Sequence, residues 1–220
     1  MLTENELKEL ASQLSLPRGD MGIVVAENMH LSNLNMTLNT IDALEVKEGD
    51  RVLEVGHGNC SHLGQLFTRQ QHCTYTGLEI SELMHTEAIK ANETFIRSGN
   101  ASFHLYNGSD IPFEEHRFNK VFTVNTLYFW KHPASFLNEL YRVMAPHGVL
   151  CIGFAWRSFM ETLPFTAFGF ELYDEARIKA LLSQSPFSLH DLVNHKETIK
   201  SKSGEEVERD YAVLRLTREA

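Results

Sequence analysis

The chain has 220 residues, of which 43% are hydrophobic and 22% are charged, so disordered and fibrous architectures are excluded. Its 20 lysines and arginines face 29 aspartates and glutamates, a net charge of −9 without a clustered basic stripe, and we expect no nucleic-acid partner. The start is polar and acidic, and no stretch is apolar over the thickness of a bilayer. We therefore expect no membrane insertion and a cytoplasmic location.

The cysteines and histidines do not predict a disulfide or a metal site. Three cysteines are an odd number, which does not suggest a disulfide framework. Cys60, His62, His72 and Cys73 are residue types that bind zinc, but their spacing matches no common zinc finger or knuckle. We expect no bound metal.

Helical spacing dominates the first 45 residues. A first apolar series consists of Leu2, Leu7, Leu10 and Leu14. Pro17, Gly19 and Gly22 then break the pattern. A second apolar stripe consists of Leu31, Leu34, Leu38, Ile41 and Leu44. We expect two helices before the first strand.

From residue 51 onward, short apolar runs alternate with amphipathic stretches. The runs "RVLEV", "CTYTGLEI", "ASFHLY", "KVFTV" and "GVLCIGFAW" read as strands, and a helix capped by Ser81 is expected to run to about Ser98. Two further strands flank "SKSG", which is a hairpin signal. The fold prediction is α/β: a doubly wound, mostly parallel seven-stranded sheet with a C-terminal antiparallel hairpin.

A glycine turn follows the first predicted strand directly. Gly56 and Gly58 suit a sharp turn in which the backbone comes close to a ligand. Glu79 ends the second strand 23 positions after Gly56, where a carboxylate can accept hydrogen bonds from both ribose hydroxyls. This pattern alone fits either a dinucleotide or S-adenosylmethionine (SAM).

Three observations favour SAM. The dinucleotide fingerprint G-x-G-x-x-G has Ser61 at its sixth position, and the chain contains no Tyr-x-x-x-Lys pair for hydride chemistry. The chain leaves little room for a separate substrate domain. A C-terminal hairpin suits the seven-stranded sheet of methyltransferases.

Four stretches carry a family resemblance. "VLEVGHGNC", "YTGLEIS", "YNGSDIPF" and "LNELYRVMAPHGVL" occur in this order and resemble the motifs of class I SAM-dependent methyltransferases, in the small-molecule branch that includes the ubiquinone and menaquinone biosynthesis enzymes. The resemblance implies a Rossmann-like methyltransferase fold and a single domain over residues 1–220. Residues 1–45 would form N-terminal helices that act as a lid, and residues 46–220 the SAM-binding core.

The resemblance also implies a set of cofactor-binding residues. The motif positions are Glu54, Gly56, His57, Gly58, Cys60, Glu79, Ile80, Asn107, Gly108 and Asn125. The first four would surround the methionine part, Glu79 the ribose, and Asn107 and Gly108 the adenine, while Asn125 would close the side of strand four. Cys60 replaces a third glycine and His147 a later one. Asn107 stands where an acid is common, and its amide can accept from the adenine amino group.

The implied reaction moves the methyl group of SAM to a small, partly apolar acceptor and releases S-adenosylhomocysteine (SAH). If a base is needed, Tyr128, His132 and His30 are candidates, and no spacing rule chooses among them. Thr126 and Leu127 occupy positions at which nucleic-acid amino-methylating enzymes carry prolines, which again argues against a nucleic acid. Aromatic residues between 157 and 175 form either core or an apolar pocket wall, and we favour the wall. The alternatives are a non-catalytic SAM-binding or regulatory protein and a NAD-linked reductase; a monomer and a homodimer are both expected as possibilities.

Overall fold

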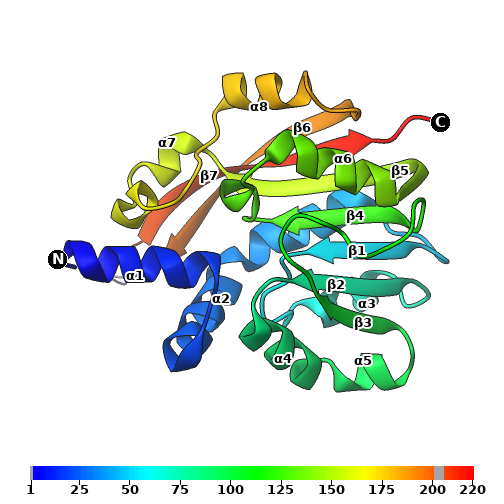
Figure 1. The fold of residues 1–220 in the computed structure, drawn as a ribbon, viewed down its shortest axis with the longest axis horizontal. Helices are drawn as coiled ribbons and strands as arrows, with labels where there is room; N and C mark the ends of the chain where they lie inside the picture. Colours follow the sequence, from blue (N-terminus) through cyan, green and yellow to red (C-terminus); the bar gives the residue numbers. More distant parts are fainter. Residues whose placement is uncertain (1, 201–205) are drawn as a thin grey trace.

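The computed structural model describes residues 2–200 and 206–220, in which seven strands form one sheet in the order β3-β2-β1-β4-β5-β7-β6 (Figure 1). The strands are β1 Arg51–Val55, β2 Thr74–Glu79, β3 Ala101–Leu105, β4 Phe118–Val124, β5 Met144–Ala155, β6 Ser188–Lys200 and β7 Glu206–Thr217. Strands β1 to β5 pair in parallel, and β7 pairs antiparallel with both β5 and β6. The predicted doubly wound sheet with an antiparallel C-terminal pair is confirmed. The residues "SKSG", expected to form the hairpin turn, lie outside the described residues.

Helices cover both faces of this sheet. They are α1 Glu4–Ser15, α2 Gly19–Leu44, α3 Leu63–Arg69, α4 Glu82–Ala91, α5 Glu93–Arg97, α6 Pro133–Val143, α7 Arg157–Met160 and α8 Glu175–Leu182, with 3-10 helices η1 Leu127–Phe129 and η2 Pro164–Ala167. The β1-to-β2 and β4-to-β5 connections run in opposite directions along the sheet, so right-handed crossovers place α3 and α6 on opposite faces. Figure 1 shows α6 in front of the sheet and the second half of α2 behind it. Within the described ranges, no helix combines the length and apolar character needed to span a membrane.

Burial on both faces of the sheet explains why the sequences of the central strands do not alternate between apolar and polar residues. In β1 every residue from Val52 to Val55 is buried, and β5 is buried from Gly148 to Ala155. A parallel strand covered by helices on both faces is expected to be apolar throughout. Chain order reverses between β1 and β4, so the carboxyl ends of these two strands form the switch point at which such folds bind ligands.

Helix α2 packs tightly on the sheet through small residues. A Cβ on Gly153 of β5 would clash with the side chain of Thr40, so this glycine allows the close approach. The hydroxyl of Thr40 donates to the carbonyl of Met36 at 2.7 Å, and Lys120 of β4 donates to the carbonyl of Leu44 at 2.5 Å. The second half of α2 is therefore fixed against β4 and β5.

Two helix predictions need correction. Helix α2 begins at Gly19 and includes Gly22, whose missing Cβ leaves room for Pro17. The predicted stripe is buried only at its end, because Ile41 and Leu44 are buried while Leu31 is 71% exposed.

The helix expected to continue to Ser98 is divided into α4 and α5. The side chain of Asn92 donates to the carbonyls of Ala88 and Cys60, at 2.9 and 3.1 Å. The backbone N–H of Asn92 also donates to Ala88, but Asn92 has the non-helical angles φ −117° and ψ 21°, and the helix is divided there. Asparagine favours such a position because its side chain competes with helical hydrogen bonds.

Candidate cofactor and acceptor site

A cavity of about 820 Å³ opens at the switch point. Its wall consists of the turn after β1, the end of β2, the loops after β3 and β4, the start of α6, and parts of α1 and α2. This volume lies within the range of small-molecule sites. Of the ten predicted cofactor residues, nine line the cavity, and Cys60 does not.

Glu79 is placed at the carboxyl end of β2 with its carboxylate held by backbone amides. Its Oε2 accepts from the N–H of Gly58 at 2.9 Å, and its Oε1 accepts from the N–H groups of Ile80 and Ser81 at 2.8 and 3.0 Å. The residue is 5% exposed. Two carboxylate oxygens offer about four acceptor positions, and the three amides occupy three of them, so the group keeps capacity for one ribose hydroxyl.

The glycine turn leaves a small open space in the cavity wall at Gly58, which we call the cradle. Gly56 and Gly58 have φ of 72° and 57°, the left-handed region that glycine adopts without strain. A Cβ on Gly56 would clash with Thr126, whereas a Cβ on Gly58 would meet no atom within 4 Å. The open space above Gly58 is therefore a place where a ligand can approach the backbone.

His57 and Cys60 are buried within the turn. The His57 ring packs at 5.1 Å from Phe103, and a Cβ on Gly77 would lie 2.6 Å from it. Its Nδ1 lies 2.7 Å from the carbonyl of Gly58, its Nε2 is buried and has no hydrogen-bond partner among residues 2–200 and 206–220, and burial lowers its pKa. Cys60 has φ of 50° and its thiol lies 3.2 Å from the hydroxyl of Tyr75, with burial raising its pKa. Both side chains are buried and help to fix the conformation of the turn.

Glu54 anchors a polar cluster beneath the cavity. Its Oε2 accepts from the hydroxyl of Tyr75 at 2.5 Å and contacts Nε2 of His62 at 2.9 Å. Glu54, Cys60 and His62 present potential metal-ligand atoms within 4.8 Å of one another. Cys73 instead donates to a backbone carbonyl. The Tyr75 hydroxyl links Glu54 and Cys60 by hydrogen bonds, and His62 joins the cluster through Glu54. The expectation of no bound metal stays a prediction.

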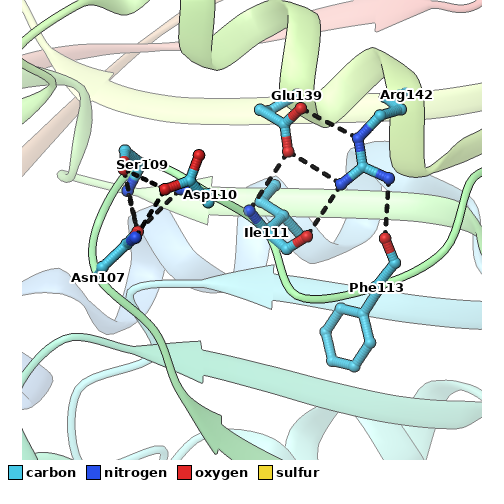
Figure 2. Close-up of polar contacts among 7 residues, drawn as sticks. All are labelled: Asn107, Ser109, Asp110, Ile111, Phe113, Glu139 and Arg142. Carbon is cyan, nitrogen blue, oxygen red and sulfur yellow. Dashed lines mark hydrogen bonds and ion pairs between the residues drawn. The ribbon is translucent and has the colours of Figure 1, made fainter.

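The loop after β3 is built around the side chain of Asn107 (Figure 2). Its Oδ1 accepts from Ser109 N, Ser109 Oγ and Asp110 N at 2.8 to 3.0 Å, and its Nδ2 donates to Asp110 at 2.7 Å. The expected role of this oxygen as acceptor for an adenine amino group is therefore taken by the loop itself. Asn107 instead shapes the loop in which Gly108, with φ of 84°, lines the cavity.

Two residues that sequence reasoning missed hold this loop in place. Arg142 donates to the carbonyls of Ile111 and Phe113 at 2.9 and 2.8 Å, and Glu139 accepts from the N–H of Ile111 at 3.3 Å (Figure 2). The two side chains also pair with each other at 2.9 Å on α6. Their spacing of three residues on a helix was the available signal, since it puts both side chains on one face.

Asn125 closes the side of β4 with a left-handed backbone. Its φ is 57°, its N–H donates to the carbonyl of Gly153 at 2.8 Å, and its Oδ1 accepts from the hydroxyl of Tyr128 at 3.1 Å. Asparagine tolerates this conformation better than most residues. Asn125 therefore lines the cavity at a fixed bend.

The three candidate bases occupy different places. Tyr128 is outside the cavity wall: its hydroxyl accepts from Ala155 N at 2.6 Å, and burial raises its pKa. His30 and His132 both line the cavity. Burial and the neighbouring His62 lower the pKa of His30, which favours its neutral, proton-accepting form. The geometry leaves these two histidines as candidates and gives Tyr128 a structural position.

The aromatic segment between 157 and 175 lies outside the cavity. Phe159 and Tyr173 are buried in the core, and the Phe170 ring lies 4.7 Å from Phe129. The expected apolar pocket wall is therefore wrong for this segment, because none of residues 157–175 lines the cavity. Other apolar side chains line the cavity instead, among them Leu14, Met29, Phe129, Trp130 and Phe136.

A buried ion pair on the hairpin fastens the half of α2 that faces the cavity. The Arg209 and Glu197 side chains are 5% and 9% exposed and meet at 2.6 Å. Arg209 also donates to the side chain of Asn33 at 2.7 Å and to the carbonyl of Ser32 at 2.6 Å. Asn33 and nearby His30 line the cavity, so this pair positions one wall of the site.

Comparison with known proteins finds similarity to methyltransferases. Residues 53–152 match a family model described as a methyltransferase domain. YrhH of Bacillus subtilis, provisionally assigned as a methyltransferase, is 31% identical over 108 residues, which cover 49% of this chain and 59% of that protein. The fatty-acid O-methyltransferase of Mycolicibacterium smegmatis is 29% identical over 129 residues, which cover 58% of this chain and 46% of that protein. The chain spans about half to three fifths of the length of these relatives.

A similar fold occurs in a solved complex between the Haloferax volcanii Trm112 methyltransferase activator and a methyltransferase. A chain of that complex superposes with a TM-score of 0.77 at 14% identity, covering 91% of this chain and 96% of that one. At this identity the likeness concerns the fold alone. It agrees with the seven-stranded mixed sheet described above.

Proposed function

We propose that this chain, whose residues 53–152 match a methyltransferase domain, transfers the methyl group of SAM to a small acceptor with an apolar body. The observation that carries the proposal is Glu79, a buried carboxylate on the cavity wall beside the open cradle at Gly58. A carboxylate at this strand end suits ribose hydroxyls, and exposed backbone at a glycine turn suits close contact with a cofactor.

The residues present fit SAM at three points. Glu79 would hold the ribose, and the backbone around Gly108 would meet the adenine. The turn at Gly56 and Gly58, with Glu54 below it, would hold the methionine part. This assignment rests on the cavity wall and on the cradle that a Cβ at Gly58 would fill.

The cavity-lining residues that are not assigned to the cofactor indicate the class of acceptor. Phe129, Trp130 and Phe136 supply apolar surface, while Lys131 and His132 stand exposed at the same wall. An apolar molecule with one polar or anionic group fits this combination. The fatty-acid enzyme among the relatives and the resemblance to quinone-biosynthesis enzymes both make apolar acceptors the first to assay.

In the proposed mechanism the protein mainly positions SAM and the acceptor. SAM supplies a methyl group on a positively charged sulfur, already activated for displacement by a nucleophile. The cavity aligns the acceptor and excludes water, which can contribute much of the rate. His30 or His132 accepts the proton where the acceptor loses one.

We infer one catalytic domain over residues 1–220, with residues 1–45 as a lid. The lid is joined to the site at Ser81, whose hydroxyl donates to the carbonyl of Pro17 at 2.6 Å. Cys60, Cys73 and Cys151 are unpaired and buried, which suits the reducing cytoplasm. We propose a monomer or homodimer without nucleic-acid partners.

Thermal denaturation tests the cofactor assignment. SAM and SAH are expected to raise the melting temperature, because a ligand that binds only the folded state stabilises it, and NAD is expected to leave it unchanged. Stabilisation by NAD alone would overturn the assignment and favour the reductase. SAM binding without turnover on any apolar acceptor would favour the non-catalytic alternative.

A further inference from the structure

The side-chain amide of Asn33 lies between a buried cation and the cavity. Its Oδ1 accepts from Nη1 of Arg209 at 2.7 Å. Because a guanidinium has no acceptor atom, this contact fixes which end of the amide faces Arg209 and turns the Nδ2 end away from it. Asn33 lines the cavity, and its Nδ2 has no hydrogen-bond partner within the described ranges and is not a fully enclosed atom. Asn33 therefore offers N–H donors to a molecule in the cavity.

A buried network holds the Asn33 amide in this orientation. Nε and Nη2 of Arg209 both donate to Oε1 of Glu197, at 3.0 and 2.6 Å, and Nη2 also donates to the carbonyl of Ser32 at 2.6 Å. The guanidinium is therefore fixed before it meets Asn33, and the amide is fixed with it. A donor that is already ordered loses little side-chain freedom when a ligand binds, which favours affinity.

The charges on the same side of the cavity favour an anionic molecule. We call this the acceptor side, and it is lined by α2 and by residues 124–139. Among the described residues that line the cavity, Lys131 is the one lysine or arginine, and it is exposed. Glu139 is the one carboxylate that the described residues place on the acceptor side, and it is paired with Arg142 at 2.9 Å. An anion therefore complements this side better than a cation does.

We propose that the methyl acceptor is a carboxylate with an apolar body, and that Nδ2 of Asn33 donates a hydrogen bond to one of its oxygens. The inference rests on the proposed function and adds to it the class of acceptor and a residue that selects this class. A carboxylate accepts hydrogen bonds and donates none, which matches an amide end that only donates. Hydrogen bonds to an ionised partner are about twice as strong as those between neutral groups.

Methyl transfer to a carboxylate needs no base. One carboxylate oxygen forms a bond to the methyl carbon, the bond between that carbon and the sulfur of SAM breaks, and its electron pair stays on the sulfur. The products are a methyl ester and SAH. A carboxylate is already ionised near pH 7, whereas an alkylamine is protonated there and must first lose a proton. The protonated amine also has no lone pair that could accept from Asn33.

The substitution Asn33→Asp tests this contact and keeps the shape of the side chain. One aspartate oxygen still accepts from Arg209, and the other replaces Nδ2 and repels a carboxylate. With dodecanoate as acceptor, KM is expected to rise about 10- to 100-fold, the range for one hydrogen bond to a charged group, while SAH affinity changes less than about twofold. The matched control is Asn28→Asp, at an exposed position of α2 outside the cavity wall, which is expected to change neither value. An unchanged KM in Asn33→Asp, or an equal rise in both variants, would overturn the role of Asn33.

The wild-type protein provides a test that does not depend on a variant folding. Dodecanoate, hexadecanoate and cinnamate are each supplied with SAM, and dodecylamine is the matched contrast. Methyl esters are expected by mass spectrometry, without methylated amine. No ester from any of the three carboxylates, or amine methylated at an equal rate, contradicts the carboxylate class. Calorimetry with SAH then shows which proposal has failed: if SAH binds, only the acceptor class is wrong, and if SAH does not bind, the proposed function fails as well.

Discussion

The two walls of the cavity are built in opposite ways. On the wall that contains the glycine turn, the Gly58 amide reaches the Glu79 carboxylate across 21 positions of sequence. On the wall formed by α2, the Arg209 guanidinium reaches Asn33 across 176 positions. The first wall depends on a short motif with fixed backbone geometry. The second depends on a hairpin at the other end of the chain, so a change there acts on the site only through the fold.

The largest effect is expected from loss of the ion pair that holds the α2 wall in place. Arg209→Met leaves Glu197 buried without its partner, and loss of one member of such a pair is expected to lower the free energy of unfolding by about 3–5 kcal/mol. Urea denaturation measures this loss. The double variant Arg209→Met, Glu197→Leu should recover much of it, because no unpaired charge stays buried. A double variant no more stable than the single one would contradict this explanation.

The second largest effect is expected from a change in the wall that contains the glycine turn. Glu79→Ala is expected to weaken SAM binding by about 1.5–3 kcal/mol, the range for hydrogen bonds to a charged group. Calorimetry measures the affinity, with Glu82→Ala on the exposed first turn of α4 as the control. Unchanged affinity in Glu79→Ala would remove this carboxylate from the site.

A pair of glycines separates backbone strain from side-chain volume. Gly58→Ala places an L residue at φ of 57°, which costs about 1–2 kcal/mol, and its Cβ would enter the cradle and weaken SAH binding. Gly64→Ala, inside α3 and with open space around its Cβ, is expected to stabilise the protein by about 0.5–1 kcal/mol. Melting temperatures that move in the same direction for both variants would show that φ is not the deciding factor.

The smallest effect concerns the loop after β3 that Glu139 and Arg142 hold in place. The Arg142 guanidinium, by its hydrogen bond, lowers the pKa of Glu139. A carboxylate whose pKa is lowered in the folded state stabilises the protein. The stabilisation is present above the usual carboxyl pKa and is lost as the pH falls through the lowered value. Because the two side chains are 30% and 31% exposed, Glu139→Gln is expected to cost about 0.5–1 kcal/mol at pH 7.

Acid titration of stability checks this contribution. The difference in stability between the wild type and Glu139→Gln should vanish at low pH, where the carboxylate is protonated. The control is Glu93→Gln, whose exposed pair with Arg97 on α5 should contribute less. A difference that persists unchanged to low pH would show that Glu139 stabilises the loop by shape and not by charge.

The sequence alone predicted the parallel sheet, the antiparallel C-terminal strands and the glycine turn. These follow from local rules: the period of apolar residues, the glycines after a strand, and an acid at the end of the next strand. Nine of the ten predicted cofactor residues line the cavity for the same reason, since the loops at one edge of a parallel sheet must lie together. Their contacts with SAM stay predictions.

Only the tertiary structure decided what the side chains at those positions do. The amide oxygen of Asn107 accepts hydrogen bonds from its own loop, and Tyr128 is enclosed in the core. The aromatic side chains of 157–175 pack on the core and on neighbouring rings and not around the cavity. Likewise Glu54 reaches His62 eight positions later, and Arg209 reaches α2. Such pairings depend on which strands and helices become neighbours, and local spacing carries no information about a partner that the fold brings from elsewhere in the chain.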